Sequence, residues 1–300
     1  MGNDMNAITI RNASKLYSGK RGRKIEALTG LSLQIHAGEV FGFLGPNGAG
    51  KSTTIKSIMG LVPLTSGNID IHGVPVSQIA ARRNVGYLPE NPAFYDFLTA
   101  REYLNFVGKV FAMSEATAEK RINETLSLLQ LTEAADRPIR GYSKGMVQRL
   151  GLAQALIHDP DLYILDEPMS GLDPLGRALV KDIIKSLRER DKTVFFSTHI
   201  TADVEMVCDR VGVIVNGKLR AVDRVSAILE QGEVGYRIHT TSKTGEAGEV
   251  NIEKQQLAEF ISKCSEEGVT VVRVEPRRKD LEAFFLETVA READESLQTS

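Results

Sequence analysis

The sequence is poor in cysteine, with only Cys208 and Cys264 among its 300 residues. The two lie far apart, so they form neither a CxxC pair nor a spacing typical of a metal site. This spacing argues against a redox motif and against a thiolate metal centre. We interpret both residues as buried or partly buried thiols in a reducing cytoplasm.

Long apolar runs are also missing. No stretch approaches the ~20 residues that a membrane-spanning helix needs, and the polar residues from Met1 to Asn6 do not resemble a signal peptide. We therefore expect a soluble, cytoplasmic chain that acts at a membrane only through a partner.

A large excess of either charge is absent as well. The sequence has 37 Lys and Arg residues against 39 Asp and Glu residues, which gives a formal net charge of −2. This balance argues against a broad nucleic-acid surface, so we expect no nucleic-acid partner. A short basic run is interpreted as a solvated loop in preference to a contact with nucleotide or membrane head groups, and it is formed by Lys20, Arg21, Arg23 and Lys24.

The length allows roughly two domains. Apolar strands alternate with helices up to Val215, which predicts an α/β fold with a mainly parallel sheet and an antiparallel β edge. Residues 7–10 alternate like an edge strand. Residues 91 to about 157 predict a helical insertion, in which Thr99 and Glu102 form a capping box. After Asp223 the pattern changes to a small α+β unit over residues 224–300, with a loop at 241–249 that is rich in Gly, Ser, Lys and Thr.

The most informative stretch runs from Phe43 to Thr53, where an apolar strand leads through a glycine-rich turn into a helix that opens on Lys51 and Ser52. Its three glycines lack a Cβ, so the backbone can curl tightly around a ligand. Successive N–H groups then point inward, and the helix N-terminus adds its positive end, which makes a cradle for phosphate. Lys51 can reach the outer phosphates, and the Ser52 hydroxyl can bind Mg²⁺.

A second chemical signal is the pair Asp166 and Glu167, which follows an apolar strand over residues 162–165. This is the placement needed for Asp166 to hold the Mg²⁺ of a nucleoside triphosphate. Glu167 is then free to face an attacking water. These residues could instead simply end a strand, but the phosphate loop upstream favours the chemical interpretation.

These segments form part of an ordered set that resembles the nucleotide-binding subunit of an ATP-binding cassette (ABC) transporter, over about residues 7–223. The set comprises residues 45–53, Leu165-Asp166-Glu167-Pro168, Ser170-Gly171-Leu172-Asp173, Ser197-Thr198-His199 and Tyr142-Ser143-Lys144-Gly145-Met146. Residues 87–92 and the segment 281–286 resemble the subfamily that serves ABC-2-type permeases, usually exporters. The fold that this implies is a P-loop NTPase core.

The resemblance implies an enzyme that hydrolyses ATP with Mg²⁺. Tyr17 would stack on adenine, although it could also be a packed surface tyrosine. Glu167 would be the general base and His199 would contact the γ-phosphate, with Lys51 assisting catalysis. Mg²⁺ would be held by Ser52, Asp166 and Glu90. The phosphate-binding residues would be Gly45, Pro46, Asn47, Gly48, Ala49, Gly50, Lys51, Ser52 and Thr53.

The resemblance also implies two protein partners. One is a second ATP-binding subunit, forming a homodimer in which Ser143 and Gly145 bind the ATP of the opposite subunit and Asp173 lines the interface. The other is a transmembrane permease, which would hold the chain at the inner face of the cell membrane. The C-terminal unit could stabilise the dimer, regulate it or contact the permease.

Two departures from the family pattern matter. Where the family usually has Leu-Ser-Gly-Gly-Gln, this chain keeps Ser143 and Gly145 but has Lys144 between them, whose charge could face the phosphate or the solvent. Glu90 stands where most members have a glutamine that couples the nucleotide site to the permease. Its carboxylate could still bind Mg²⁺ or could pair with a cation of the permease.

Two other functions fit part of the sequence. One is a soluble ABC ATPase acting on DNA or ribosomes, but such proteins usually have tandem cassettes, a long coiled-coil insertion or a basic extension, which we do not find here. The other is a regulatory module that binds ATP with little hydrolysis. The presence of both Glu167 and His199 argues against it.

Overall fold

The computed structural model describes residues 6–19, 24–230, 233–242, 245–278 and 280–298. Lys20, Arg21 and Arg23 of the basic run lie outside these ranges. The chain divides into two units, Met1–Val222 and Asp223–Ser300. Each unit is described by itself.

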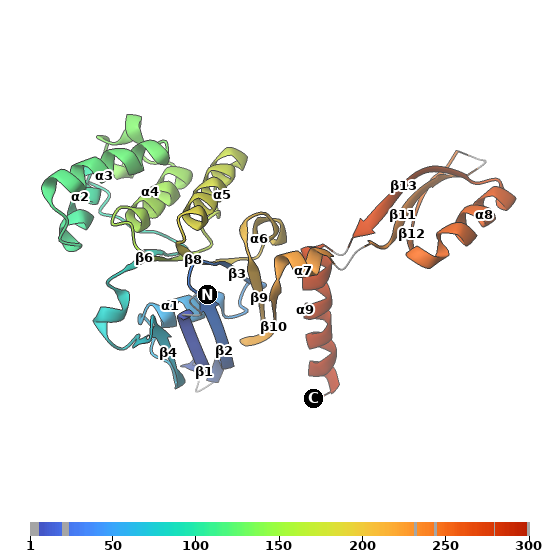
Figure 1. Ribbon diagram of the computed structural model, residues 1–300, viewed down its shortest axis with the longest axis horizontal. Coiled ribbons are helices and arrows are strands. Elements are labelled where there is room, and N and C mark those ends of the chain that lie inside the picture. Colours follow the sequence, from blue (N-terminus) through green and yellow to red (C-terminus); the bar gives the residue numbers. More distant parts are fainter. Residues whose placement is uncertain (1–5, 20–23, 231–232, 243–244, 279, 299–300) are drawn as a thin grey trace. The chain divides into compact units, whose positions relative to one another are not determined.

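A six-stranded sheet forms the centre of the first unit (Figure 1). Its strands in spatial order are β10 (Lys218–Arg224), β9 (Arg210–Val215), β3 (Val40–Leu44), β8 (Thr193–Thr198), β7 (Leu162–Asp166) and β6 (Val85–Leu88). The strands from β9 to β6 pair in parallel. Every residue of β3, β7 and β8 is buried, as expected for parallel strands covered on both faces.

A hairpin forms one edge of this sheet. Asn216 and Gly217 connect β9 to β10, and both have positive φ angles, 49° and 75°. Two-residue turns of this kind join antiparallel strands. The predicted mainly parallel sheet with an antiparallel edge is therefore confirmed.

A second, antiparallel sheet belongs to the same unit. Its strands in spatial order are β2 (Lys24–His36), β1 (Asn6–Ser18), β4 (Ser66–Ile71) and β5 (Val74–Pro75). The prediction that residues 7–10 form an edge strand is wrong, because β1 pairs with β2 on one side and β4 on the other. Alternation showed that one face of this strand is polar, but it carried no information about the number of neighbours.

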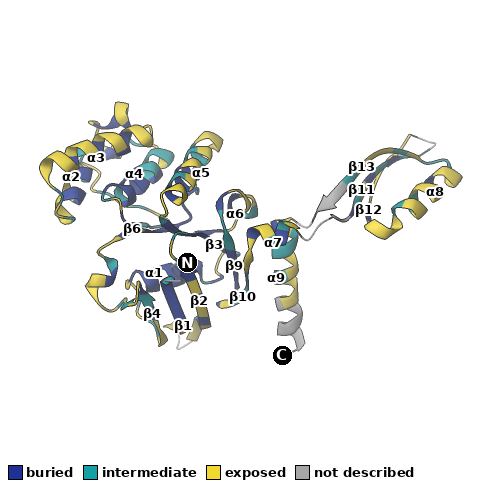
Figure 2. Cartoon of the chain, viewed as in Figure 1, coloured by how far each residue is buried: buried dark blue, intermediate teal, exposed yellow. Residues whose placement is uncertain are grey.

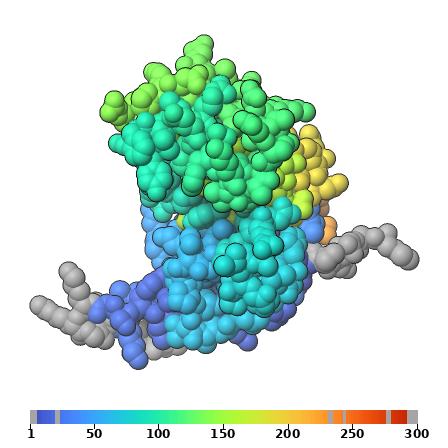
Figure 3. Space-filling view, turned by 90° about the vertical axis from the view of Figure 1, so that its left-hand side faces the viewer, coloured from blue at the N-terminus to red at the C-terminus, as the bar shows by residue number. Residues whose placement is uncertain are grey.

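Helices fill the connections between the strands. They are α1 (Lys51–Ile58), α2 (Ala100–Val110), α3 (Glu115–Leu128), α4 (Lys144–Leu156), α5 (Pro174–Glu189) and α6 (Thr201–Val207), with short 3₁₀ helices η2 (Ile79–Arg82), η3 (Thr132–Ala134) and η4 (Ile139–Gly141). The green residues of α2, α3 and α4 gather at one end of the unit (Figure 3). The capping box predicted for Thr99 and Glu102 is confirmed at the start of α2. Helix α6 was not expected from the sequence.

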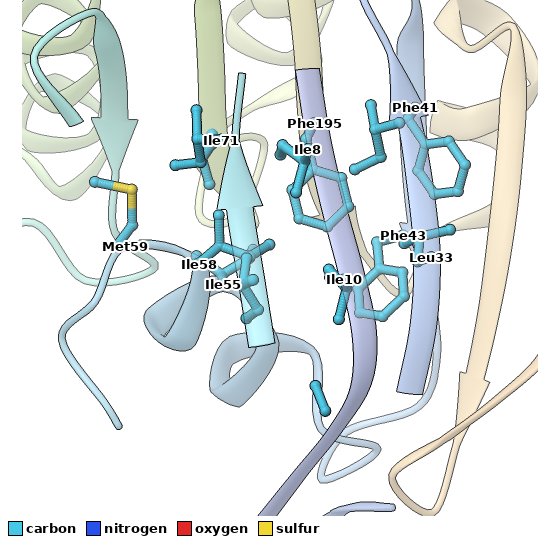
Figure 4. Close-up of a cluster of buried hydrophobic side chains, with 14 of the residues drawn as sticks. Ile8, Ile10, Leu33, Phe41, Phe43, Ile55, Ile58, Met59, Ile71 and Phe195 are labelled. Atoms are coloured by element: carbon cyan, nitrogen blue, oxygen red, sulfur yellow. The ribbon is translucent and has the colours of Figure 1, made fainter. Parts of the chain in front are cut away.

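The main apolar core of this unit anchors α1, the helix that follows the phosphate loop. Ile55 and Ile58 of α1 are fully buried and pack with residues of β1, β3, β4 and β8 (Figure 4). Burying an aliphatic side chain of this size contributes roughly 1.5–3 kcal/mol. Helix α1 is thus held in place by Ile55 and Ile58, and most of its residues are buried or partly buried (Figure 2).

The second unit contains a three-stranded antiparallel sheet of order β12-β11-β13. Its elements are α7 (Val225–Glu230), β11 (Glu233–Thr241), β12 (Ala247–Glu253), the short η5 (Lys254–Gln256), α8 (Leu257–Glu267), β13 (Thr270–Arg278) and α9 (Leu281–Gln298). The loop predicted at 241–249 is too long, because β12 begins at Ala247 and pairs with β11. Its polar side chains suggested a loop, whereas backbone pairing with β11 forms the strand.

Over the residues that the structure describes, no helix combines the length and the apolar character needed to cross a bilayer.

The close packing of α4 on β6 predicts that Gly86→Ala destabilises the first unit. A Cβ at Gly86 would lie 2.4 Å from the carbonyl oxygen of Ala155, and this backbone atom of α4 has little freedom to move away. We expect the free energy of unfolding to fall by ~1–3 kcal/mol, which thermal denaturation would show as a lower midpoint. The control is Gly141→Ala, whose Cβ would have no atom within 4 Å. Equal midpoints for the two variants would contradict this account of the packing.

Candidate functional site

The phosphate loop lies between β3 and α1 and is held closely by neighbouring backbone. The N–H of Gly45 donates to the Thr198 carbonyl at 3.3 Å. Gly48 and Gly50 have φ angles of 81° and 110°, in the region that residues with a Cβ rarely adopt. A Cβ at Gly50 would also lie 2.7 Å from the Ala27 carbonyl oxygen. Glycine at these positions thus permits both the curl of the loop and its close approach to β2.

A pocket of about 260 Å³ opens over this loop. It brings together residues that are distant in the sequence, since Glu90 follows β6 and Glu167 follows β7. The pocket is lined by Ala27, Pro46, Asn47, Gly48, Gly50, Lys51, Ser52, Thr53, Glu90 and Glu167. All but Ala27 belong to the site residues expected from the sequence. Gly45 and Ala49 of the predicted set are buried behind the loop.

Lys51 is a buried cation within this pocket. Its Nζ donates to the carbonyl oxygens of Gly45 at 2.7 Å and Pro46 at 3.3 Å. It also lies 3.4 Å from Glu167 Oε1, in an ion pair whose side chains are only 7% and 10% exposed. A phosphate group could replace these partners, because Lys51 lines the pocket together with the glycine-rich loop.

Asp166 lies beside the pocket with a carboxylate that is incompletely satisfied. Its Oδ1 accepts hydrogen bonds from Ser197 Oγ at 2.6 Å and from Ser52 Oγ at 3.3 Å. Its Oδ2 is buried and has no hydrogen-bond partner among the described residues. Burial raises the pKa of this carboxyl group, Glu90 and Glu167 raise it further, and the two serine hydroxyls act in the opposite direction.

This arrangement fits a divalent cation. A buried oxygen without a partner costs free energy, and Mg²⁺ prefers carboxylate and hydroxyl oxygens together with phosphate oxygens and water. No cluster of three or more His, Cys, Asp or Glu side chains within the described part of the chain could hold a metal ion alone. Asp166 and Ser52 therefore fit an ion that arrives with a phosphorylated ligand and takes its remaining ligands from that molecule and from water.

The side chain and the backbone N–H of Glu167 are held by three groups. His199 Nδ1 lies 3.1 Å from both carboxylate oxygens, and Lys51 approaches Oε1. The backbone N–H of Glu167 donates to Ser197 Oγ at 3.0 Å. Glu167 has a φ of 50°, which is uncommon for a residue with a Cβ. Its position is therefore imposed by its surroundings.

Besides Gly45, Ala49, Asp166 and His199, four more of the predicted residues are not among those that line the pocket. Tyr17 lies on β1 with 37% exposure, and Lys15 Nζ is 5.0 Å from the centre of its ring. Ser143 is the N-cap of α4, and Gly145 lies in the first turn of that helix. Asp173 is the N-cap of α5 and accepts from the Gly176 N–H at 2.7 Å.

Two polar residues at the site were not predicted from the sequence. Ser197 bridges Asp166 and the Glu167 backbone, and Gln148 is buried against the segment that follows β7. Ser197 is paired with Asp166 by the parallel register of β7 and β8, which a single sequence does not reveal. Gln148 occupies a helix position that amphipathic periodicity alone would assign to packing.

The phosphate loop, the buried lysine and the carboxylates at parallel strand ends together define a P-loop nucleoside triphosphatase. The family model described as "ABC transporter" matches residues 28–170. An ABC transporter ATP-binding protein of Synechocystis is 41% identical over 266 residues, which cover 87% of this chain and 72% of that protein. The chain belongs to the ABC transporter family.

Two further comparisons bear on the class. The Nod factor export ATP-binding protein I of Burkholderia lata is 39% identical over 230 residues, which cover 76% of this chain and 74% of that protein. A solved dimeric ATP-binding cassette, bound to ADP and Pi in a post-hydrolysis state, superposes with a TM-score of 0.68 at 26% identity, over 72% of this chain and 98% of the other. The predicted family, ATPase class and P-loop fold are confirmed.

The buried charge of Asp166 predicts a stability effect of Asp166→Asn in the ligand-free protein. Because the pKa of this carboxyl group is raised in the folded state, its ionisation lowers the free energy of unfolding as pH rises through the folded pKa. The amide of the variant keeps an oxygen for the two serines but carries no charge. At pH 7 we expect a higher thermal midpoint than in the wild type, with the difference shrinking as pH falls from the folded pKa towards the ordinary Asp value of about 4, below which Asp166 is protonated in both the folded and the unfolded state.

The control for this measurement is Asp182→Asn on the exposed face of α5, which should change the midpoint little at either pH. A midpoint of Asp166→Asn below the wild-type value at pH 7, or a difference that does not vary with pH, would refute the assigned cost of the buried charge.

Proposed function

We propose that this chain binds and hydrolyses ATP to power a separate transmembrane permease, of the ABC-2 export type, through closure of a dimer of ATP-binding subunits. The observation that best supports ATP hydrolysis is the contact of Glu167 with both Lys51 and His199 beside the phosphate pocket. The export part is supported by similarity to a protein named for Nod factor export. Location at the inner face of the cell membrane follows from association with the permease.

Nucleotide binding would use the groups of the phosphate loop. Backbone N–H groups of residues 45–53 and the start of α1 would face the phosphates. Lys51 would exchange its ion pair with Glu167 for the outer phosphates. Ser52 and Asp166, with Glu90 at the pocket wall, would hold Mg²⁺, which neutralises charge on the phosphate oxygens. Tyr17 would stack on adenine.

Hydrolysis would depend on Glu167 as the general base. In the structure this carboxylate is paired with Lys51 and His199. Once phosphates take up Lys51, one carboxylate oxygen becomes available to accept a proton from the attacking water. His199 is 48% exposed in its side chain, so it can contact the γ-phosphate while still orienting Glu167.

A second subunit would complete each site. Ser143 and Gly145 at the N-terminus of α4 would bind the γ-phosphate of the opposite subunit's ATP, and Asp173 would line the interface. The similarity to a dimeric cassette bound to ADP and Pi supports this assembly. We assign the ATPase domain to residues 1–223, with a helical subdomain at about 91–157, and a dimer-stabilising or regulatory role to residues 224–300.

The proposal predicts that Glu167→Gln lowers the rate of ATP hydrolysis by ~10²–10⁴ while leaving ATP binding intact. The amide keeps the shape of the side chain but accepts no proton from water. The variant should also accumulate as an ATP-bound dimer, which size-exclusion chromatography with ATP and Mg²⁺ would detect.

The control is Glu189→Gln at the exposed end of α5, which makes the same chemical change away from the pocket and should hydrolyse ATP at the wild-type rate. Unchanged turnover in Glu167→Gln would exclude Glu167 as the general base.

A further inference from the structure

Helix α4 contacts the segment that follows β7 through its first two turns. Gly145 faces Leu172, since a Cβ at Gly145 would lie 3.6 Å from Leu172 Cδ2. The stem of Lys144 lies against Gly171, where a Cβ would come within 2.7 Å of Lys144 Cε. Gln148, about one turn further on, reaches the beginning of the same segment. These contacts make one continuous strip between α4 and residues 167–172.

Gln148 makes the polar contact of this strip. It is 5% exposed, and its Nε2 lies 3.3 Å from the carbonyl oxygens of both Glu167 and Pro168. An amide nitrogen has two protons, so it can donate to both carbonyls at once. The Glu167 carbonyl also accepts from the Ser170 N–H at 3.0 Å. Removal of the amide would therefore leave the Glu167 carbonyl with one donor and take the Gln148 donor from the buried Pro168 carbonyl, which is costly.

These hydrogen bonds stabilise an uncommon backbone conformation at Glu167. Glu167 has a φ of 50°, and a residue with a Cβ in a sparsely populated region persists only where its surroundings hold it. Ser197 from β8 accepts from its N–H, and Gln148 from α4 donates to its carbonyl. The peptide groups on both sides of Glu167 are therefore fixed by side chains of two different elements.

The same helix begins with Ser143 and Gly145. In the proposed function these residues contact ATP held by the opposite subunit, whereas Glu167 acts on ATP held by its own subunit. Only five positions separate Ser143 from Gln148, within one rigid helix. A shift of α4 toward the opposite ATP would therefore be transmitted to the backbone of Glu167.

We propose that Gln148 is a positioning residue that couples the two ATP sites of the dimer, setting the orientation of Glu167 according to whether the N-terminus of α4 has engaged the ATP of the partner. This inference rests on the proposed function and adds the residue through which one ATP site of the dimer affects the other. It requires ATP hydrolysis to be cooperative in ATP concentration.

Arg149 provides a matched control on the same helix. It is the next residue, and it donates to the carbonyl oxygens of Leu129 and Gln130, within the helical part of the first unit. Arg149→Leu thus removes one partly buried and one exposed hydrogen bond from α4 to backbone carbonyl groups without changing the contacts of Gln148 with the segment after β7. It reports the general effect of weakening the attachment of this helix.

The experiment compares the ATP dependence of hydrolysis by the full-length wild type, Gln148→Met, Gln148→Glu and Arg149→Leu. Methionine matches glutamine in length and flexibility. Gln148→Glu keeps the shape of the side chain and replaces the donating amide. Either variant tests the inference, provided that it folds. For the wild type we expect a Hill coefficient above 1 and up to ~2 for two sites. For the Gln148 variants we expect kcat to fall ~10- to 100-fold, because Glu167 would be misplaced. Their Hill coefficient should be near 1. The ATP concentration at half-maximal rate should change by less than about twofold.

Arg149→Leu should keep the wild-type Hill coefficient. The inference is overturned if the wild type is not cooperative, if the folded Gln148 variants keep the wild-type kcat or Hill coefficient, or if Arg149→Leu matches them in both. Glu167→Gln is measured in parallel. Full activity in that variant would overturn the role of Glu167 itself, whereas its inactivity together with an unaltered Gln148 variant would overturn only the coupling.

Discussion

The parallel pairing of β3, β7 and β8 is the constraint on which the site depends. Parallel strands end at the same edge of a sheet, so residues that follow them are brought together whatever their separation in sequence. The phosphate loop follows β3, Glu167 follows β7 and His199 follows β8. The register also sets Ser197 opposite Asp166. A slip of one residue in either pairing would turn these side chains to the opposite face of the sheet.

The charges gathered at this edge balance one another in the absence of a ligand. Lys51 is shared between loop carbonyls and Glu167, and Glu167 is shared between Lys51 and His199. Among these described side chains, Asp166 keeps an oxygen without a partner. Glu167 is thus paired with two basic side chains, whereas Asp166 has one oxygen that no described group satisfies. In the proposed function, a phosphorylated ligand would take Lys51 from Glu167 and its cation would take the free oxygen of Asp166.

Much of the candidate site could be predicted from the sequence, because the residues that indicate it lie close together in the chain. The glycines and Lys51 lie within one short segment, and Asp166 directly follows an apolar strand, so spacing alone indicated their chemistry. The roles of Ser197 and Gln148 depend on contacts between elements that are far apart in the chain, and no spacing encodes them. The same reason explains the two errors in the fold, since the neighbours of β1 and the pairing of β12 are set by backbone hydrogen bonds to other strands.

The anchoring of α1 in the apolar core has a thermodynamic consequence. Ile55 and Ile58 hold the helix whose first residues form the floor of the pocket, so that floor exists before any ligand arrives. Preformed sites lose little chain entropy on binding. The heat-capacity change of binding to one isolated chain should then be small, and a large negative value would report apolar surface buried elsewhere, as when two chains come together. Calorimetry can therefore distinguish ligand binding at the phosphate loop from the association of two chains.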